Sequence, residues 1–250
     1  MRRPFPTRFA LLLACLPGAI LPASAQPADA PASGQTNTPA PAIRTLASGL
    51  LAVGGTRVDP RLRTVTVPAF VNLQEGIVEY VLVHSSGKTH ESLLRTDVGA
   101  REIHVAMLLL GATGAGTNAL PLDPAETLPG DTVTVDIRWT EGRRARSVAA
   151  EEVVYDRRLG SALRRGRWTY TGSRLREDGF GAQVDGSIIS LITDPDALVN
   201  NPRRGREDDD NWLAKARRLP EFNHPVDVVI TLLPPASRPA PGTGPRAPRR

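Results

Sequence analysis

Apolar and polar residues alternate with a period of two along several segments, and this pattern constrains the fold more than any other feature of the sequence. In 64–71 the apolar residues Val65, Val67 and Ala69 alternate with largely polar neighbours, and 132–139 repeats the pattern. Successive side chains of a β-strand point to opposite faces of a sheet, so the alternation predicts strands with one buried face. The expected strands are 64–71 and 77–83, paired across a turn at 72–76, then 132–139 with 143–154 returning beside it, 167–175, 182–184, 187–193 and 226–233.

Two segments are expected to be helical. The first, 98–110, has an apolar stripe at helical spacing, Asp97 as its N-cap and Gly111 at its C-terminal end. The second is shorter and covers 211–218. Aromatic residues make up only 4% of the chain, so aliphatic side chains must fill the core. Together these features predict an α+β fold: a mainly antiparallel, strand-rich domain with one main helix, about 98–110, packed on a sheet.

The first 25 residues have the pattern of an export signal. A basic start is followed by the apolar stretch 9–16 and by the small residues of Ala23–Ala25, after which cleavage would leave Gln26 first. The apolar stretch is short and is followed by Pro17 and Gly18, so it does not suit a permanent membrane anchor. An alternative is a lipoprotein signal, because residues 12–15 resemble a lipobox in which Cys15 would be acylated. The expected location is outside the cytoplasm, either free in the periplasm or medium or tethered through Cys15.

The rest of the chain divides by composition. Residues 26–42 and 235–250 are rich in Pro and contain few large apolar residues, so both are expected to be disordered. The segment 43–234 between them has the length of a single domain. No transmembrane helix is expected in the mature chain.

The net charge of +5 does not indicate a nucleic-acid-binding protein. Of the 31 basic residues, seven lie in 1–25 and 238–250, which leaves 43–237 with 24 basic and 25 acidic residues. A domain that binds nucleic acid concentrates basic residues on one face, and this balance gives no such excess. The single cysteine, Cys15, lies in the signal segment, so no disulfide framework and no iron–sulfur cofactor are expected.

Two short motifs are read as loop elements. Gly87-Lys88-Thr89 matches the end of a phosphate-binding loop, but Leu82 occupies the position where that loop needs its first glycine. We therefore expect an ordinary connection without nucleotide. Asp194-Pro195-Asp196 follows an expected strand and predicts a turn, or a cap for 197–200.

The acidic run 207–210 offers carboxylates of the kind that calcium prefers. It lacks the alternation and the central glycine of an EF-hand loop. Arg203, Arg204 and Arg206 lie beside it and could neutralise it. A solvated loop with its own counterions is the favoured interpretation.

One cluster could carry chemistry. His90, Glu91 and Ser92 follow the expected strand 77–83, and His104 lies on the expected helix, on the flank of its apolar stripe. Imidazole, carboxylate and hydroxyl groups serve acid–base catalysis and metal binding, so these four residues are the candidate catalytic residues, with His90 and His104 as the ligands of any metal. Leu94 stands where a His-Glu-x-x-His zinc motif would place its second histidine. A purely structural role, in which the imidazoles join loop to helix through hydrogen bonds, is the favoured interpretation, because no nucleophile elbow or paired metal motif accompanies the cluster.

These residues belong to a longer series of short motifs. The series comprises Val58-Asp59, Glu75-Gly76, Glu79-Tyr80, Gly87–Ser92, Ile103–Ala106 and Gly111-Ala112. Together they resemble the bacterial YdjY-domain proteins, over about residues 55–233. The resemblance implies an exported or envelope-associated domain without an assigned activity. Some proteins of that family are described as ferredoxin-like, which this chain does not support, because its one cysteine is Cys15.

Two functions from different classes follow. The first is a non-catalytic envelope module that binds a protein, a glycan or a small ligand. The second is a hydrolase or metal-dependent enzyme that works through His90, Glu91 and His104. A cavity beside a partly buried His–Glu pair would favour the enzyme.

Overall fold

The computed structural model describes residues 40–116 and 119–235. The strands in these ranges are β1 (Ile43–Thr45), β2 (Leu51–Val53), β3 (Thr56–Asp59), β4 (Thr64–Val71), β5 (Tyr80–His84), β6 (Ser92–Thr96), β7 (Asp131–Glu141), β8 (Arg144–Ala149), β9 (Val154–Asp156), β10 (Ser161–Ala162), β11 (Trp168–Tyr170), β12 (Leu175–Arg176), β13 (Gly179–Phe180), β14 (Ser187–Ser190), β15 (Val199–Asn200), β16 (Trp212–Ala214) and β17 (Pro225–Leu232). The α-helices are α1 (Ala100–Leu109) and α2 (Gly181–Asp185), and short 3-10 helices are η1 (Thr89–Glu91), η2 (Ala150–Val153) and η3 (Ala216–Arg218).

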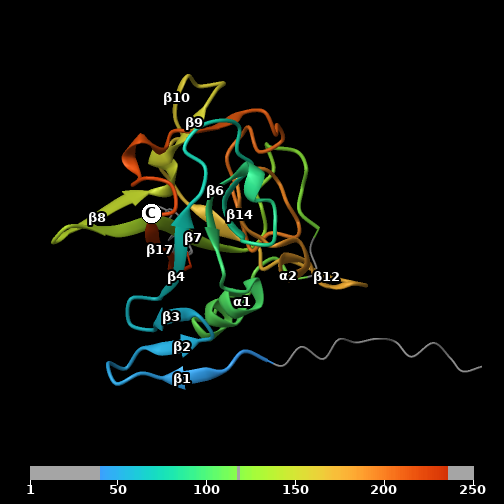
Figure 1. The fold of residues 1–250 in the computed structure, drawn as a ribbon. Helices are drawn as coiled ribbons and strands as arrows, with labels where there is room; N and C mark the ends of the chain where they lie inside the picture. The colour runs from blue at the N-terminus through green and yellow to red at the C-terminus, as the bar shows by residue number, and fades with distance from the viewer. Residues whose placement is uncertain (1–39, 117–118, 236–250) are drawn as a thin grey trace, which may run out of the picture. The chain divides into compact units, whose positions relative to one another are not determined.

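One large sheet organises the described part of the chain (Figure 1). Its strand order is β1-β2-β3-β4-β17-β7-β11-β15-β14-β5-β6, and β6 pairs back onto β4. The eight strands from β4 through β17 to β6 therefore form a closed ring. Most neighbours are antiparallel, whereas β5–β6 and β14–β15 are parallel. This architecture confirms the predicted strand-rich, largely antiparallel fold with one main helix.

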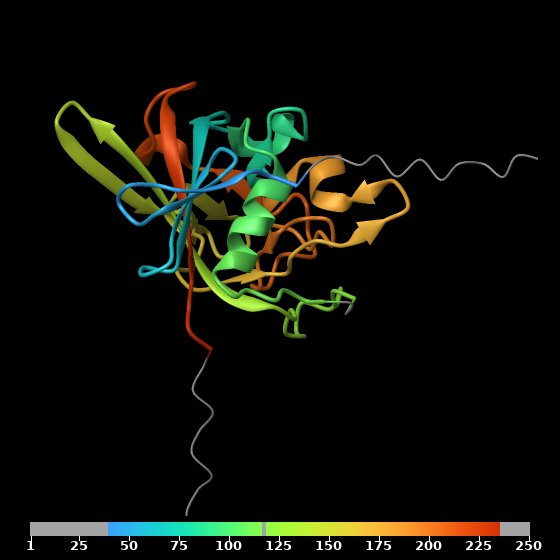
Figure 2. The ribbon, with the colours of Figure 1, turned by 90° about the horizontal axis from the view of Figure 1, so that it is seen from below.

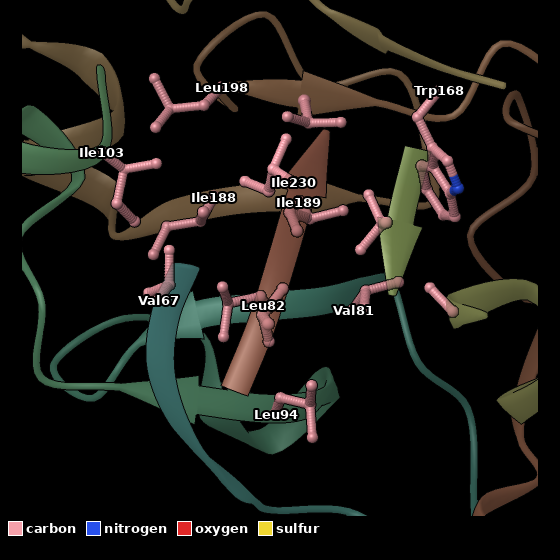
Figure 3. Close-up of a cluster of buried hydrophobic side chains, with 14 of the residues drawn as sticks. Val67, Val81, Leu82, Leu94, Ile103, Trp168, Ile188, Ile189, Leu198 and Ile230 are labelled. Carbon is pink, nitrogen blue, oxygen red and sulfur yellow. The ribbon is translucent and has the colours of Figure 1, made fainter. Parts of the chain in front are cut away.

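The core lies where the alternating residues of the strands face inward. In β4, Val65, Val67 and Ala69 are buried, as the period of two predicts, and β7 follows the same rule. Figure 3 shows Val67, Leu82 and Ile189 among the aliphatic side chains gathered in this interior. Aliphatic residues from strands far apart in sequence thus share one core.

Helix α1 packs beside β2, β3 and β4 (Figures 1 and 2). Its buried face includes Ile103, Ala106 and Met107, which confirms the predicted stripe. The helix begins at Ala100 rather than at 98, because its N-cap is Gly99 and not Asp97, and no side chain caps it. Gly111 lies just after its end with φ +85°, a conformation that glycine adopts without steric penalty.

The predicted pairing of 64–71 with 77–83 is wrong. Strand β6 lies between β4 and β5, antiparallel to the first and parallel to the second. The second strand also begins later than expected, at Tyr80. Four successive residues from Tyr80 to Val83 are fully buried, so β5 has no solvent face and its sequence carries no alternation from which to infer its neighbour.

Other boundaries also differ from the prediction. Residues 182–184 form part of helix α2 instead of a strand, because three residues are too few to reveal a period. Within 211–218, strand β16 pairs with β9, and only η3 is helical. The expected strand 167–175 is divided into β11 and the start of β12, and 143–154 gives way to η2 after β8.

Among the described residues, no helix is both long and apolar enough to cross a membrane. The expected signal peptide at 1–25, Cys15 and most of the expected disordered segments 26–42 and 235–250 lie outside the described residues.

Candidate functional site

The loop between β5 and β6 carries three of the four candidate catalytic residues. His90 lies on η1 with 79% of its side chain exposed, and its Nε2 is 3.6 Å from Oε2 of Glu91. Ser92 is fully buried, and its hydroxyl donates a hydrogen bond to the backbone carbonyl of Leu94 at 2.8 Å. The serine hydroxyl therefore supports the start of β6 and is not accessible as a nucleophile.

The fourth residue, His104, has different neighbours. Its Nδ1 lies 2.7 Å from the hydroxyl of Tyr170, and its ring packs on Phe180 with 4.9 Å between the ring centroids. Burial lowers the pKa of His104, so the neutral imidazole is favoured. Burial, together with the charge of Asp131, raises the pKa of Tyr170. The pair is a neutral hydrogen bond between helix α1 and strand β11.

The structure does not bring the two imidazoles together. Helix η1, with His90, immediately precedes β6, whereas α1, with His104, follows its other end (Figure 1). A strand of this length spans about 16 Å at the usual rise per residue. The described part of the chain also contains no group of three or more His, Cys, Asp or Glu side chains placed to hold a metal ion.

A buried polar chain joins the loop to the core. Lys88 donates from Nζ to the hydroxyl of Tyr80 at 2.7 Å, and that hydroxyl donates to Oδ2 of Asp194 at 2.9 Å. Burial and the charge of Asp194 raise the pKa of Tyr80, which keeps the phenol protonated. Asp194 also accepts from the backbone N–H of Asp196 at 2.8 Å, so the structure contains the turn expected at 194–196. Lys88 of the Gly87-Lys88-Thr89 motif thus binds its loop to Tyr80 of β5, and the Tyr80 hydroxyl joins β5 to this turn.

Two carboxylates lie beside this chain. The backbone N–H of Glu79 donates to the carbonyl of Glu91 at 2.9 Å. Burial and the nearby carboxylate of Glu91 raise the pKa of Glu79, although Lys88 acts in the opposite direction. Glu79 belongs to the series of short motifs but not to the candidate catalytic residues, because its raised pKa depends on the parallel pairing of β5 and β6, which brings Glu91 beside it.

A pocket of about 550 Å³ opens elsewhere, between the segments 156–167 and 202–204. Its walls carry six arginines and one acid, together with apolar groups from two leucines and a proline. The lining residues are Asp156, Arg158, Leu159, Leu163, Arg164, Arg165, Gly166, Arg167, Pro202, Arg203 and Arg204. Its volume lies within the range of sites that hold small ligands.

Three of these arginines are held by carboxylates of the protein. Arg203 pairs with Glu151 at 2.8 Å, Arg165 with Glu152 at 2.6 Å and Arg158 with Glu207 at 3.3 Å. The side chain of Arg203 is only 15% exposed. Its guanidinium also lies over the ring of Trp168, with 5.1 Å between Cζ and the ring centroid. Arg203 is therefore a rigid part of the pocket wall.

The other three arginines have no such partner. The side chains of Arg164, Arg167 and Arg204 make no ion pair or hydrogen bond with any residue in 40–116 or 119–235. All three residues are exposed. The pocket is therefore lined by three arginine residues whose guanidinium groups have no partner within these ranges and are available to an anion.

The family model of the YdjY domain matches residues 56–231 of the chain, from the start of β3 into β17. The chain belongs to the YdjY domain family. No curated protein and no solved structure matches it significantly. This assignment agrees with the resemblance inferred from the short motifs. Of those motifs, Ile103–Ala106 lies in α1, whereas Glu75-Gly76 and Gly111-Ala112 lie in connections between elements.

Within this YdjY domain the acidic run 207–210 differs from its expected arrangement. Arg206 is 1% exposed and does not neutralise the run. It donates instead to backbone carbonyls of the loop that precedes β7, including those of Asp123 and Pro124 at 2.7 and 3.0 Å. Glu207 pairs with Arg158 at the pocket. A buried arginine cannot be recognised from a charge run alone, since the partner carbonyls come from a distant segment.

The two candidate histidines, His90 and His104, should differ in their effect on stability. We expect His104→Ala to reduce the free energy of unfolding by about 1–3 kcal/mol, because the Tyr170 hydroxyl loses its partner in a half-buried site. His90→Ala should change it by less than about 0.5 kcal/mol, because the side chain is exposed. Denaturant unfolding of both variants and the parent measures the difference.

The pH dependence of stability tests whether the imidazole of His104 is neutral in the folded state. Because the pKa of His104 is lowered in the folded state, the unfolded chain binds this proton at higher pH than the native one. The contribution of His104 to stability is therefore complete above the ordinary histidine pKa of 6.5 and is lost as the pH falls below it. The stability difference between the parent and His104→Gln should shrink on acidification through this range. A difference that stays constant would contradict the buried, neutral imidazole.

Proposed function

We propose that this YdjY domain is an exported, non-catalytic binding module of the bacterial envelope, and that it holds an anionic ligand in the arginine-lined pocket. The observation that carries the proposal is the unpaired charge of Arg164, Arg167 and Arg204 around a hollow of ligand size. Arginine presents a planar fork of donors that suits carboxylate and phosphate groups.

The placement of polar groups favours this pocket over the loop between β5 and β6. Lys88 in that loop and Ser92 at the start of β6 direct their donors to other groups of the fold, and the side chain of His90 is 79% exposed to solvent. At the pocket, the guanidinium groups of Arg164, Arg167 and Arg204 have no partner within the described ranges, which favours a ligand as their partner. Binding without turnover is thus the simplest function that uses these residues.

Residues 1–25 are proposed to direct export and to be removed by cleavage. The basic start, the short apolar stretch and the Ala23–Ala25 site predict that the mature chain begins at Gln26. The mass of the protein purified from its native cells measures this. An acylated N-terminus at Cys15 would contradict a soluble mature form but would keep the domain outside the cytoplasm.

Anion binding can be measured through the intrinsic fluorescence of the three tryptophans, of which Trp168 lies under Arg203 of the pocket wall. We expect at least one anion among citrate, phenyl phosphate and phenyl sulfate to give a saturable change with the full chain at constant ionic strength. The double variant Arg167→Gln/Arg204→Gln should weaken that binding by at least about tenfold, because two charge-assisted contacts are lost.

The matched control is Arg143→Gln/Arg144→Gln. Both arginines are exposed at the hairpin of β7 and β8, and neither lines the pocket. Their substitution removes the same net charge as the double variant of the pocket. This control should bind like the parent. If no anion gives saturation, or if both double variants weaken binding equally, the pocket is not a specific anion site.

A further inference from the structure

The charges around the pocket do not balance, and the imbalance indicates the charge of the ligand. Its walls carry six arginines. The acids at the pocket are Asp156 in the wall and Glu151, Glu152 and Glu207, which pair with wall arginines. Six positive charges thus face four negative ones. Counted over the wall arginines and the acids that line the pocket or pair with them, the surplus is two positive charges.

The ion pairs within the protein show that one arginine of the pocket wall binds about one carboxylate. Every carboxylate at the pocket engages a single wall arginine as an ion pair or close neighbour, with Arg158 also 3.9 Å from Asp156. A ligand with one carboxylate would match one of the three unpaired guanidiniums. A dianionic group with three terminal oxygens, such as a phosphate monoester, matches a surplus of two charges and can accept from more than one guanidinium fork.

The apolar part of the wall indicates that the ligand is more than an inorganic ion. Leu159 is 51% exposed and Leu163 is buried, and both line the pocket beside Pro202. An exposed leucine at the mouth of a charged hollow can cover an apolar body while the arginines hold the anionic group.

We propose that the ligand of the pocket is a small phosphate monoester with an apolar body, bound through Arg164, Arg167 and Arg204 and covered by Leu159. This inference rests on the proposed function, because it specifies the ligand class of the same site.

The test compares two ligands of the same shape. Phenyl phosphate is a dianion at about pH 8, whereas phenyl sulfate is a tetrahedral monoanion. In the fluorescence titration with the full chain, phenyl phosphate should bind at least about tenfold more tightly than phenyl sulfate, and more tightly than inorganic phosphate. Leu159→Ser should remove the preference for phenyl phosphate over inorganic phosphate and leave the affinity for inorganic phosphate unchanged. Leu159 is half-exposed, so this substitution is expected to fold.

The outcomes separate the two proposals. Equal affinity for phenyl phosphate and phenyl sulfate, or saturation by citrate alone, would overturn the phosphate monoester while the anion-binding pocket would stand. Equal affinity for phenyl phosphate and inorganic phosphate would overturn the apolar body. The absence of saturation with all of these probes would overturn the anion-binding function together with the ligand class.

Discussion

Replacing Arg206 with Met should reduce the free energy of unfolding by about 3 kcal/mol. Arg206 is 1% exposed, and its guanidinium donates to Thr193 Oγ1 at 3.1 Å and to carbonyls of the loop between α1 and β7. Those carbonyls belong to Pro121, Asp123, Pro124 and Glu126. Methionine preserves much of the buried volume but donates nothing, so the carbonyls lose their charged partner. The loss stays below the sum of five bonds, because the loop can open and expose the carbonyls to water.

Thermal unfolding measures the loss of overall stability in Arg206→Met, and hydrogen exchange measures the loosening of the loop that Arg206 holds. A loss of about 3 kcal/mol corresponds to a fall in melting temperature of about 6–12 °C for a domain of this size. Amide protection should fall most in 119–130, where the loop is held. Arg204→Met is the control, because the side chain of Arg204 is exposed and makes no ion pair within the described ranges. If Arg206→Met unfolds like this control, the loop does not depend on the guanidinium.

The sequence predicted strands well where one face is buried and the other is solvated. Strands β4 and β17 match their predicted ranges to within a residue, and β7 extends only slightly beyond its range. Strand β5 was located less well, because it is buried on both faces and its sequence has no alternation. The short strands β9 and β16 exist because they pair with each other across more than fifty residues, and no local pattern encodes such a partner.

The candidate site could be predicted only in part, because it too depends on contacts between segments that are distant in the sequence. The family was identified correctly from the sequence, but the distance between His90 and His104 depends on where β6 enters the sheet. The pocket was missed because the charge count over 43–237 averages arginines and acids that are segregated in space. The sequence did contain a local sign of a basic site, because Arg164, Arg165 and Arg167 lie within four residues. Only the fold shows that Arg203 and Arg204 face the same hollow.

Gly130→Ala should be among the most destabilising single substitutions in the domain, with a loss of about 3–5 kcal/mol. Gly130 has φ +137°, a conformation that residues with a Cβ rarely adopt. An added Cβ would also overlap the backbone carbonyl oxygen of Tyr170 and lie 3.0 Å from Thr169 Cγ2. The carbonyl belongs to β11, which is paired with β7 next to this glycine, so it cannot move without loss of strand pairing. The substitution should therefore also disturb the contact of Tyr170 with His104.

Gly179→Ala separates the strain of the backbone conformation from the overlap with β11. Gly179 in β13 has a similar φ, +128°, but the nearest atom to an added Cβ there is Val184 Cγ2 at 3.6 Å, an ordinary van der Waals distance. Backbone conformation alone should lower its stability by about 1–3 kcal/mol. Denaturant unfolding of both variants gives the comparison. A much larger loss for Gly130→Ala means that the close approach of β11 requires the glycine, and equal losses would show that β11 shifts to accommodate a methyl group. In the first case the register of Tyr170 against Asp131 depends on the absence of a side chain at position 130.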